Sequence, residues 1–186
     1  MWHGFLRTPD GTFTTIDGTS AVQTISFSVN AGSAITGYYV DTKSFVHGFM
    51  RASKGAFTTF DVPNAIFAYP VSMNAADAVT GYYLDASFHS HGFLRTGDGT
   101  LTTFSAQPDA PYTHPAGITS GGTIVGSYVD STTMVHGFLR ERNGTITTID
   151  VPGAIHTFPA SITSSSAISG FYVDADYKGH GFLRTQ

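Results

Sequence analysis

The motif His-Gly-Phe-Leu-Arg occupies residues 3–7 and returns four times, beginning at His47 (where Met replaces Leu), His91, His136 and His180. The intervals between these histidines are 44, 44, 45 and 44 residues. A fixed period of this length is typical of repeat architectures, in which each unit buries its apolar face only by stacking on its neighbours. Residues 1–186 are therefore expected to form a single repeat domain, with units beginning at each histidine and a partial fifth unit at His180.

The composition predicts an all-β protein and excludes several classes of function. Only 12% of the residues are charged, the formal net charge is −4, and Thr, Val, Ile, Tyr and Phe outnumber the strong helix formers. No basic cluster offers a surface to nucleic acid, and no apolar run is long enough to span a membrane. The chain has no cysteine, so it has neither disulfides nor thiolate sites.

Each unit contains four segments of alternating apolar and polar residues, which indicates four half-buried strands. Short turns rich in Gly, Asp and Ser join consecutive segments and favour tight hairpins, so each unit is expected to be an antiparallel meander. The first segments are residues 26–30, 70–74, 115–119 and 159–163, and the second are 34–41, 78–85, 123–130 and 167–174. The third segments carry the His-Gly-Phe motif, and the fourth are 12–17, 56–61, 100–105 and 145–150.

A longer, proline-containing link joins each fourth segment to the next first segment, for example residues 62–69 and 151–158. Such a link is what a β-propeller needs to pass from the outer strand of one blade to the inner strand of the next. We therefore expect a β-propeller of four-stranded antiparallel blades. A β-trefoil-like or other repeat barrel is the alternative fold, and the tight hairpins argue against a β-solenoid.

The segments amount to seventeen strands, one more than four blades need. The expected closure has residues 12–17 complete the blade begun by residues 159–184, which closes a four-bladed ring through the N- and C-terminal strands. The alternative is a five-bladed ring, or a ring that a second chain completes. The chain is thus expected to be a monomer or to assemble with itself into a ring.

The repeats resemble a family of bacterial extracellular proteins known as HAF repeats. The resemblance covers the whole chain and rests on Gly-Tyr-Tyr-Val-Asp at 37–41, His-Gly-Phe at 47–49 and Thr-Thr-Phe-Asp at 58–61, repeated with variation. The third unit, which begins at His91, departs from the pattern with Gly126-Ser127-Tyr128 in place of Gly-Tyr-Tyr and with Ser105 in place of the closing Asp. The resemblance implies a propeller-like form and an extracellular or cell-surface location, and it implies no activity. The start of the chain in mid-unit suggests a segment of a longer protein.

An Asp ends each second segment and a His opens each third one, so each pair faces the other across a short loop. A ring of these histidines around an axial metal ion is one interpretation. The third strand, however, lies about 10 Å from the innermost strand, too far for metal–nitrogen bonds of about 2 Å. We therefore interpret these residues as structural and expect no metal or cofactor. They are His47, His91, His136, His180, Asp41, Asp85, Asp130 and Asp174.

Two smaller patterns could also bind ions. His89 and His91 project to one side of a strand, and Asp174 and Asp176 could hold calcium, but each set lacks further ligands. The arginines that end each third segment could form an anion-binding ring. We expect them instead to lie over apolar surface and to pair with nearby carboxylates. These arginines are Arg7, Arg51, Arg95, Arg140 and Arg184.

The residues that differ between units, in the loops between strands and blades, are the candidates for function. Aromatic rings beside imidazoles suit a glycan or another small polar ligand, although the same rings could simply fill gaps between blades. The candidate ligand-binding residues are Tyr69, His89, Tyr112, His114, His156, Phe158 and Tyr177.

Two functions of different classes follow from these candidates. The first is a non-catalytic ligand-binding or scaffold propeller, with carbohydrate as the favoured ligand. The alternative is a polysaccharide-acting lyase or hydrolase, in which His114 or His156 is the base, Tyr69 or Tyr112 the acid, and Lys178 or an Asp stabilises charge. No nucleophile elbow, metalloprotease helix or phosphate loop is present. The near-symmetry of the units favours the binding module.

Overall fold

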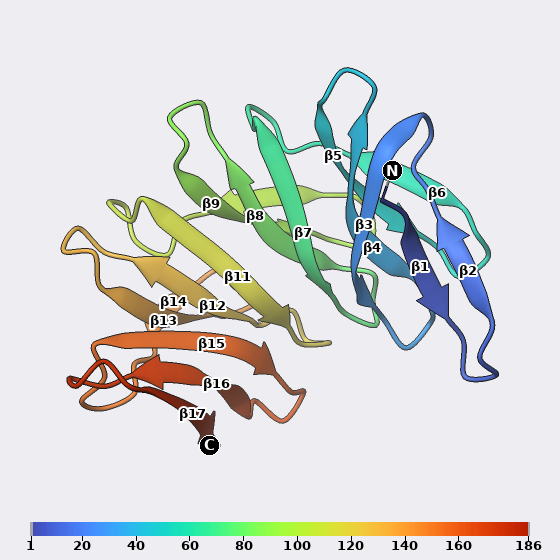
Figure 1. Ribbon diagram of the computed structural model, residues 1–186. Helices are drawn as coiled ribbons and strands as arrows, with labels where there is room; N and C mark the ends of the chain where they lie inside the picture. The colour runs from blue at the N-terminus through green and yellow to red at the C-terminus, as the bar shows by residue number, and fades with distance from the viewer. Residues whose placement is uncertain (1, 186) are drawn as a thin grey trace.

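The computed structural model describes residues 2–185, which form seventeen β-strands arranged as an arc of meanders (Figure 1). From here on, a unit is one meander counted from its first to its fourth strand, so the first unit begins at β3. The first strands are β3 (Ala21–Val29), β7 (Phe67–Met73), β11 (Tyr112–Ile118) and β15 (His156–Ile162). The second strands are β4 (Ile35–Asp41), β8 (Val79–Leu84), β12 (Ile124–Val129) and β16 (Ile168–Val173). The third are β1 (Gly4–Arg7), β5 (Val46–Arg51), β9 (Ser90–Arg95), β13 (Val135–Arg140) and β17 (Gly179–Arg184), and the fourth are β2 (Phe13–Ile16), β6 (Phe57–Phe60), β10 (Leu101–Phe104) and β14 (Ile146–Thr148).

The predicted all-β class and the predicted number of strands are confirmed. Strands β3 to β6 form a separate four-stranded antiparallel sheet in sequence order. Strands β7 to β17 pair in the same antiparallel order, but single parallel bridges, Tyr112 to Ser90 and His156 to Val135, join them into one eleven-stranded sheet. Within the described residues, no helix could cross a membrane.

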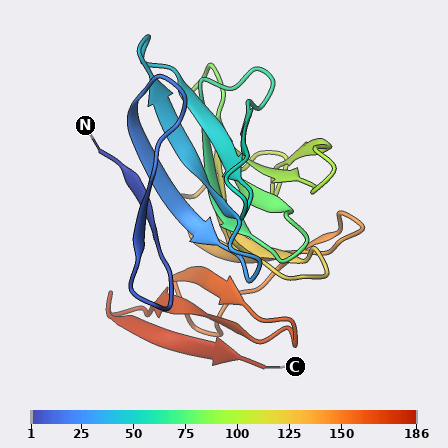
Figure 2. The ribbon, with the colours of Figure 1, turned by 90° about the vertical axis from the view of Figure 1, so that its right-hand side faces the viewer.

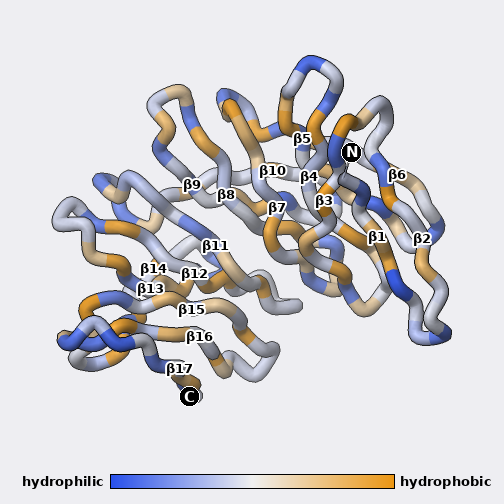
Figure 3. Tube along the Cα trace, in the orientation of Figure 1, coloured by the Kyte–Doolittle hydropathy of each residue, from blue (hydrophilic) through white to orange (hydrophobic). Residues whose placement is uncertain are grey.

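Every hairpin uses the same short turn, in which a residue of positive φ precedes the return strand. Between third and fourth strands this residue is glycine, as in Gly55 and Gly99, with φ of 95° and 94°. Polar residues gather at these turns, while apolar ones occupy the strands (Figure 3). The turns between second and third strands instead place bulky Phe88 and Tyr177 at φ near 60°, a conformation that disfavours large side chains.

A β-bulge interrupts each first strand, and in three units it occurs at a proline, for example between Pro70 and Ser72. The residue that has no partner in the ladder is the one after the proline, Val71 in the second unit, while Pro70 itself is paired with Gly81. The glycine of the Gly-Tyr-Tyr motif lies opposite. A Cβ on Gly81 would stand 2.0 Å from the carbonyl oxygen of Tyr69, so only glycine allows the two backbones to approach this closely.

The predicted ring closure is wrong. Strand β2 pairs with β1 rather than with β17, and the resulting hairpin is a separate two-stranded sheet beside β3 (Figure 2). Strand β17 pairs only with β16, so the units are not blades closed into a ring, and the two chain ends lie at different ends of the arc. The physical reason is that β2 already forms its backbone hydrogen bonds with β1. In addition, Ile16 of β2 packs on Phe49 of the next unit, which holds β2 at this end of the arc.

The core consists of one apolar cluster at each junction between successive units. The phenylalanine of the His-Gly-Phe motif lies at the centre of these clusters. Phe93 is fully buried, and its ring meets Phe60, from the fourth strand of the preceding unit, edge-on at 6.0 Å between ring centroids. Phe138 meets Phe104 in the same way at 6.1 Å. Each unit therefore supplies half of two interfaces and completes neither alone.

The motif histidine ties three strands of its unit together. In the third unit His136 Nδ1 lies 2.7 Å from Asp150 at the end of the fourth strand, and Nε2 lies 3.2 Å from Asp130 at the end of the second. The ring also stacks on Tyr128 at 5.2 Å. Oδ1 of Asp130 accepts the backbone N–H groups of Thr132 and Met134 and so fixes the hairpin loop.

The other units repeat this network with variations. His47 contacts Asp61 and Asp41, His91 contacts Asp85 and the hydroxyl of Ser105, and His180 contacts Asp174. The predicted His–Asp neighbours are thus within hydrogen-bonding distance in the units that contain His47, His91, His136 and His180. Each histidine lies within one sheet rather than at the centre of the arc. In residues 2–185, no three His, Asp or Glu side chains gather as a metal site.

These contacts shift the pKa values of both partners. Burial lowers the pKa of His136, but the hydrogen bonds and charges of Asp150 and Asp130 outweigh it, so the pKa lies above 6.5; the same balance with Asp61 and Asp41 raises the pKa of His47. Desolvation raises the pKa of Asp130, and hydrogen bonds from Thr132, Met134 and His136 overcome it, which leaves the pKa at about 2. A histidine that donates from both nitrogens must be protonated, which explains the direction of its shift.

The interfaces between units predict that Phe93→Ala will destabilise the protein by about 3–5 kcal/mol, because it leaves a cavity between two units. The free energy of unfolding, measured by urea denaturation, checks this value. Phe45→Ala is the matched control, since this phenylalanine is exposed in a loop, and it should change the free energy by less than about 0.5 kcal/mol. Equal effects of the two substitutions would contradict the assignment of the core.

The pKa shifts of the His–Asp networks predict that the contribution of these networks to stability is greatest between about pH 3.8 and 6.5. Because the pKa values of His47 and His136 are raised in the folded state, their protonation stabilises the fold fully below pH 6.5. This contribution disappears as the pH rises through the pKa values of the folded state. Because the pKa values of Asp85 and Asp130 are lowered in the folded state, their ionised carboxylates stabilise the fold above pH 3.8. This contribution disappears as the pH falls through the folded pKa, which for Asp130 is about 2. Urea denaturation from pH 3 to pH 9 measures the profile, and stability that rises steadily from pH 6 to pH 9 would refute it.

Candidate functional site

The first strands of successive units line one side of the arc. Strand β3 contacts β7, β7 contacts β11, and β11 contacts β15, whereas the described fourth strands make no comparable contacts with one another. The first strands are therefore innermost, as predicted. Because side chains alternate along a strand, residues such as Tyr69 and His114 occupy equivalent places on this inner surface.

A continuous series of aromatic rings crosses the inner surface from the first unit to the third. Tyr38 meets Tyr69 edge-on at 5.3 Å, Tyr69 lies 5.0 Å from its cross-strand partner Tyr82, and Tyr82 stacks on His114 at 4.4 Å. Tyr112 continues the series at 6.4 Å from His114. We call these five residues the inner aromatic series. The series brings together predicted residues from two different units, β7 and β11.

Three tyrosines of this series, Tyr38, Tyr69 and Tyr82, are half-buried, and they remain protonated over a wide pH range. Burial raises the pKa of Tyr38, Tyr69 and Tyr82 above 10, and the nearby phenol of Tyr69 raises those of the other two further. Each phenol therefore keeps an O–H group that can donate a hydrogen bond. Rings with a polar edge of this kind combine an apolar face with a donor.

His114 lies in the unit that departs most from the repeat. Its equivalents in the other units are Ile25, Tyr69 and Phe158, and its cross-strand partner is the small Ser127, where the other units have an aromatic ring. One face of the imidazole stacks on Tyr82, and no described ring covers the face towards Ser127. His114 is accessible to solvent but crowded by its neighbours, and this desolvation lowers its pKa.

A buried serine orients His114. Ser90 Oγ lies 2.7 Å from His114 Nε2, and Ser90 has no exposed surface. A Ser–His pair at this distance is the arrangement of an activated nucleophile. Because Ser90 is completely buried, it cannot reach a substrate outside the protein. Ser90 is therefore a positioning residue, which holds Nε2 and leaves Nδ1 of His114 for another partner.

The fourth unit presents a second, smaller aromatic group. Phe158 stacks on its cross-strand partner Phe171 at 4.5 Å, and His156 lies 6.2 Å from Phe158. Nδ1 of His156 accepts the backbone N–H of Val135, which joins β13 to β15. This nitrogen is therefore occupied in the structure, and only Nε2 of His156 is free to contact a ligand.

The remaining candidates lie in loops and not in the inner aromatic series. His89 is exposed in the β8–β9 loop, one residue before Ser90, and Tyr177 and Lys178 are exposed in the β16–β17 loop. Lys178 lies 3.8 Å from Asp176 on the surface. The structure therefore separates the lysine of the catalytic hypothesis from the inner aromatic series that contains Tyr112 and His114.

Sequence reasoning missed Tyr38, Tyr82 and Ser90. The signal was present, because the first Tyr of the Gly-Tyr-Tyr motif lies on the inner face in the alternation of β4 and β8, while the second Tyr stacks on the motif histidine. The contact of Ser90 with His114 joins two units through a single parallel bridge. No local pattern predicts a contact of that kind.

Two arginines of the motif, Arg95 and Arg140, lie over aromatic rings of the preceding unit. Arg95 lies over Phe60 at 5.2 Å and Arg140 over Phe104 at 4.8 Å, and both guanidinium groups are largely buried. Burial lowers the pKa of Arg140. The expectation that they pair with carboxylates is wrong for these two, since no salt bridge to either occurs among the described residues.

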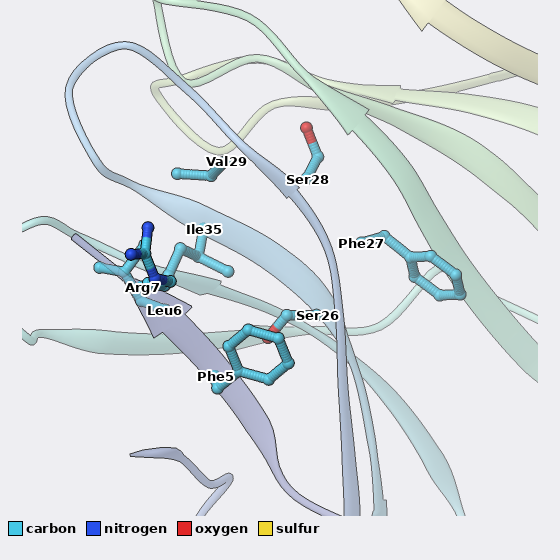
Figure 4. A pocket seen from close by; sticks show the side chains of 8 residues that line it. All are labelled: Phe5, Leu6, Arg7, Ser26, Phe27, Ser28, Val29 and Ile35. Carbon is cyan, nitrogen blue, oxygen red and sulfur yellow. The ribbon is translucent and has the colours of Figure 1, made fainter. Parts of the chain in front are cut away.

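A surface depression lies at the N-terminal end of the arc, between β1 and β3 (Figure 4). Phe5 and Leu6 line it on one side of β3, and the side chain of Phe27 projects to the other side. Phe27 lies 5.8 Å from Tyr38 and so connects this depression with the inner aromatic series. The full lining is Phe5, Leu6, Arg7, Ser26, Phe27, Ser28, Val29 and Ile35.

Comparison with known proteins identifies the fold alone. No model of a protein family and no curated protein matches this sequence. Among solved structures, the chain is similar to selenomethionine-substituted virginiamycin B lyase from Staphylococcus aureus, with a TM-score of 0.57 and 12% identity over 96% of this chain and 61% of the lyase. It is also similar to a triple arginine-to-alanine mutant of AofleA from Arthrobotrys oligospora, with a TM-score of 0.52 and 13% identity over 97% of this chain and 63% of that one. The chain thus spans less than two thirds of either protein, and its fold is all-β and propeller-like.

Proposed function

We propose that this chain is a non-catalytic ligand-binding module whose inner aromatic series binds carbohydrate. The observation that supports the proposal is the unbroken succession of half-exposed rings from Tyr38 to Tyr112 across three units. Sugar rings present apolar C–H faces together with hydroxyl groups. Aromatic faces flanked by phenol and imidazole groups match both features, because an aromatic side chain offers an apolar face and Tyr adds a polar tip.

An extracellular or cell-surface location remains part of this proposal, as does membership of the HAF-repeat family. Both rest on the resemblance of the repeat motifs. A polysaccharide ligand is consistent with such a location. A series that spans several units also suits an extended ligand, which could contact more than one unit at a time.

The competing function is an enzyme acting on polysaccharide, and His114 is the observation that favours it. Its lowered pKa keeps the imidazole neutral near pH 7, and Ser90 fixes its orientation, as a general base requires. Tyr112 would then be the acid. The structural similarity to a lyase supports the fold only. It assigns no role to any residue, since only 12% of the residues are identical.

The binding proposal predicts that Tyr69→Ala and Tyr82→Ala will each weaken glycan binding about fivefold, or about 1 kcal/mol, because each removes one ring of several. A glycan array on the purified chain identifies the ligand, and calorimetry measures the affinity. The matched control is Phe45→Ala, an exposed ring that does not belong to the series, which should leave the affinity unchanged.

Two outcomes would contradict this reading. Unchanged binding after simultaneous replacement of Tyr69, Tyr112, His114 and His156 would exclude the inner surface as the site. Turnover of a polysaccharide that His114→Ala abolishes, while Tyr69→Ala leaves it largely intact, would establish the enzyme instead.

The environment of His114 predicts that its imidazole titrates below pH 6.5, whereas His47 and His136 titrate above it. Burial lowers the first value, and paired carboxylates raise the other two. NMR titration of the histidine ring protons measures all three, with His114→Asn to assign the resonance. Titration of His114 above pH 6.5 would contradict the crowded environment and remove the support for a neutral base.

A further inference from the structure

The two ends of the arc expose faces that are buried between units everywhere else. At the N-terminal end, Phe5 occupies the motif position of Phe93 and Phe138, which are fully buried, yet it is 63% exposed. Phe13, beside it at 5.6 Å between ring centroids, is 65% exposed. Within residues 2–185, neither ring is covered as Phe93 and Phe138 are.

At the C-terminal end of the described residues, the last sheet has the three strands β15, β16 and β17. Leu183 is 70% exposed, whereas its equivalent Leu139 packs into the cluster around Ile168. Strand β17 pairs with β16 alone, so its other edge offers unpaired backbone N–H and C=O groups, where β5, β9 and β13 each pair with a fourth strand. Open edges of this kind readily accept another strand.

The histidine networks at the two ends are complementary halves of the network found inside the arc. His136 contacts one carboxylate from the second strand and one from the fourth. Among residues 2–185, Asp174 from the second strand is the one carboxylate that contacts His180. At the N-terminal end of the same range, the one carboxylate that contacts His3 is Asp17, which follows the fourth strand β2, at 2.8 Å.

The strands that carry these halves are interchangeable, because residues 3–8 and 180–185 have the identical sequence His-Gly-Phe-Leu-Arg-Thr. Strand β1 pairs with β2 through Gly4 to Ile16 and Leu6 to Thr14. Strand β17 could therefore replace β1 against β2 in the same register, with Leu183 opposite Thr14. The exchange would also place Asp17 at the free Nδ1 of His180.

We propose that two copies of this 186-residue chain associate head to tail, with β2 of one copy displacing its own β1 and adding to β17 of the other. The contact regenerates the four-stranded sheet and the complete histidine network that the interior units have. Each copy then contributes four four-stranded sheets, so two copies close a ring of eight, within the range of about four to eight blades that propellers adopt. A contact of this type is heterologous and must close or propagate.

The mass of the chain in solution is the first test. Light scattering at micromolar concentration should give twice the 19.7 kDa of one chain. Leu183→Glu should restore the monomer mass, because it buries a charge at the new junction, and the exposed-loop variant Phe45→Glu should leave the dimer intact. A wild-type chain that is monomeric up to 100 µM would overturn the proposal.

Cross-linking tests the register, since the chain has no native cysteine. A Thr14→Cys chain mixed with a Leu183→Cys chain should form a disulfide between the two positions under mild oxidation, identified by peptide mass. The matched control replaces Thr14→Cys by Thr58→Cys, the equivalent position in β6, whose partner Met50 lies in the same sheet. At least tenfold more cross-link with Thr14→Cys is expected. Equal yields, or a dimer without this cross-link, would refute strand exchange.

Discussion

The burial of the motif phenylalanine against the preceding unit is the interaction on which the rest of the structure depends. A meander of four short strands exposes apolar residues on both faces, and it becomes stable only when neighbours cover them. Phe49, Phe93 and Phe138 occupy the centres of three successive junctions and have no exposed surface. The period of the sequence is therefore the period of the interfaces, and the arc is the shape that results from stacking twisted sheets in series.

The histidine networks act within each unit and complement the junctions between units. A phenylalanine joins neighbouring sheets, whereas the histidine two residues before it joins three strands of one sheet. The carboxylate at the end of the second strand has two tasks, because one oxygen fixes the hairpin loop and the other contacts the imidazole. Because the phenylalanine stabilises the contact between sheets and the histidine stabilises the sheet itself, the two residues occur together in every unit. Each of these histidines is turned towards its own sheet, so those of different units do not share one site.

Much of the fold could be predicted from the sequence, because the predicted features depend on local patterns. Alternating residues and turn glycines placed the strands, and the loop of Asp41 to His47 placed the carboxylate beside the imidazole. Ring closure could not be predicted, since it depends on whether β2 prefers β1 or β17, and these two strands carry the same sequence. The inner aromatic series was only half predicted, because Tyr38 and Tyr82 belong to a motif that looks purely structural.

The third unit shows how a repeat can acquire a distinct site. His114 and Ser127 replace the aromatic pair of the neighbouring units, and Ser90 in the preceding unit holds the imidazole in place. These three changes leave the junction core intact, because none of the three side chains belongs to an apolar cluster between units. The inner surface is thus free to vary while the buried phenylalanines remain.

A double-mutant cycle across one junction tests most directly the claim that contacts between successive units hold the arc together. Phe60→Ala, Phe93→Ala and the double variant would be compared by urea denaturation. Because the rings meet at 6.0 Å, a coupling free energy of about 0.5–1.5 kcal/mol is expected, and the pair Phe60 and Phe138, which lie in different junctions, should show none. Additive effects of Phe60→Ala and Phe93→Ala, with no coupling, would contradict the account.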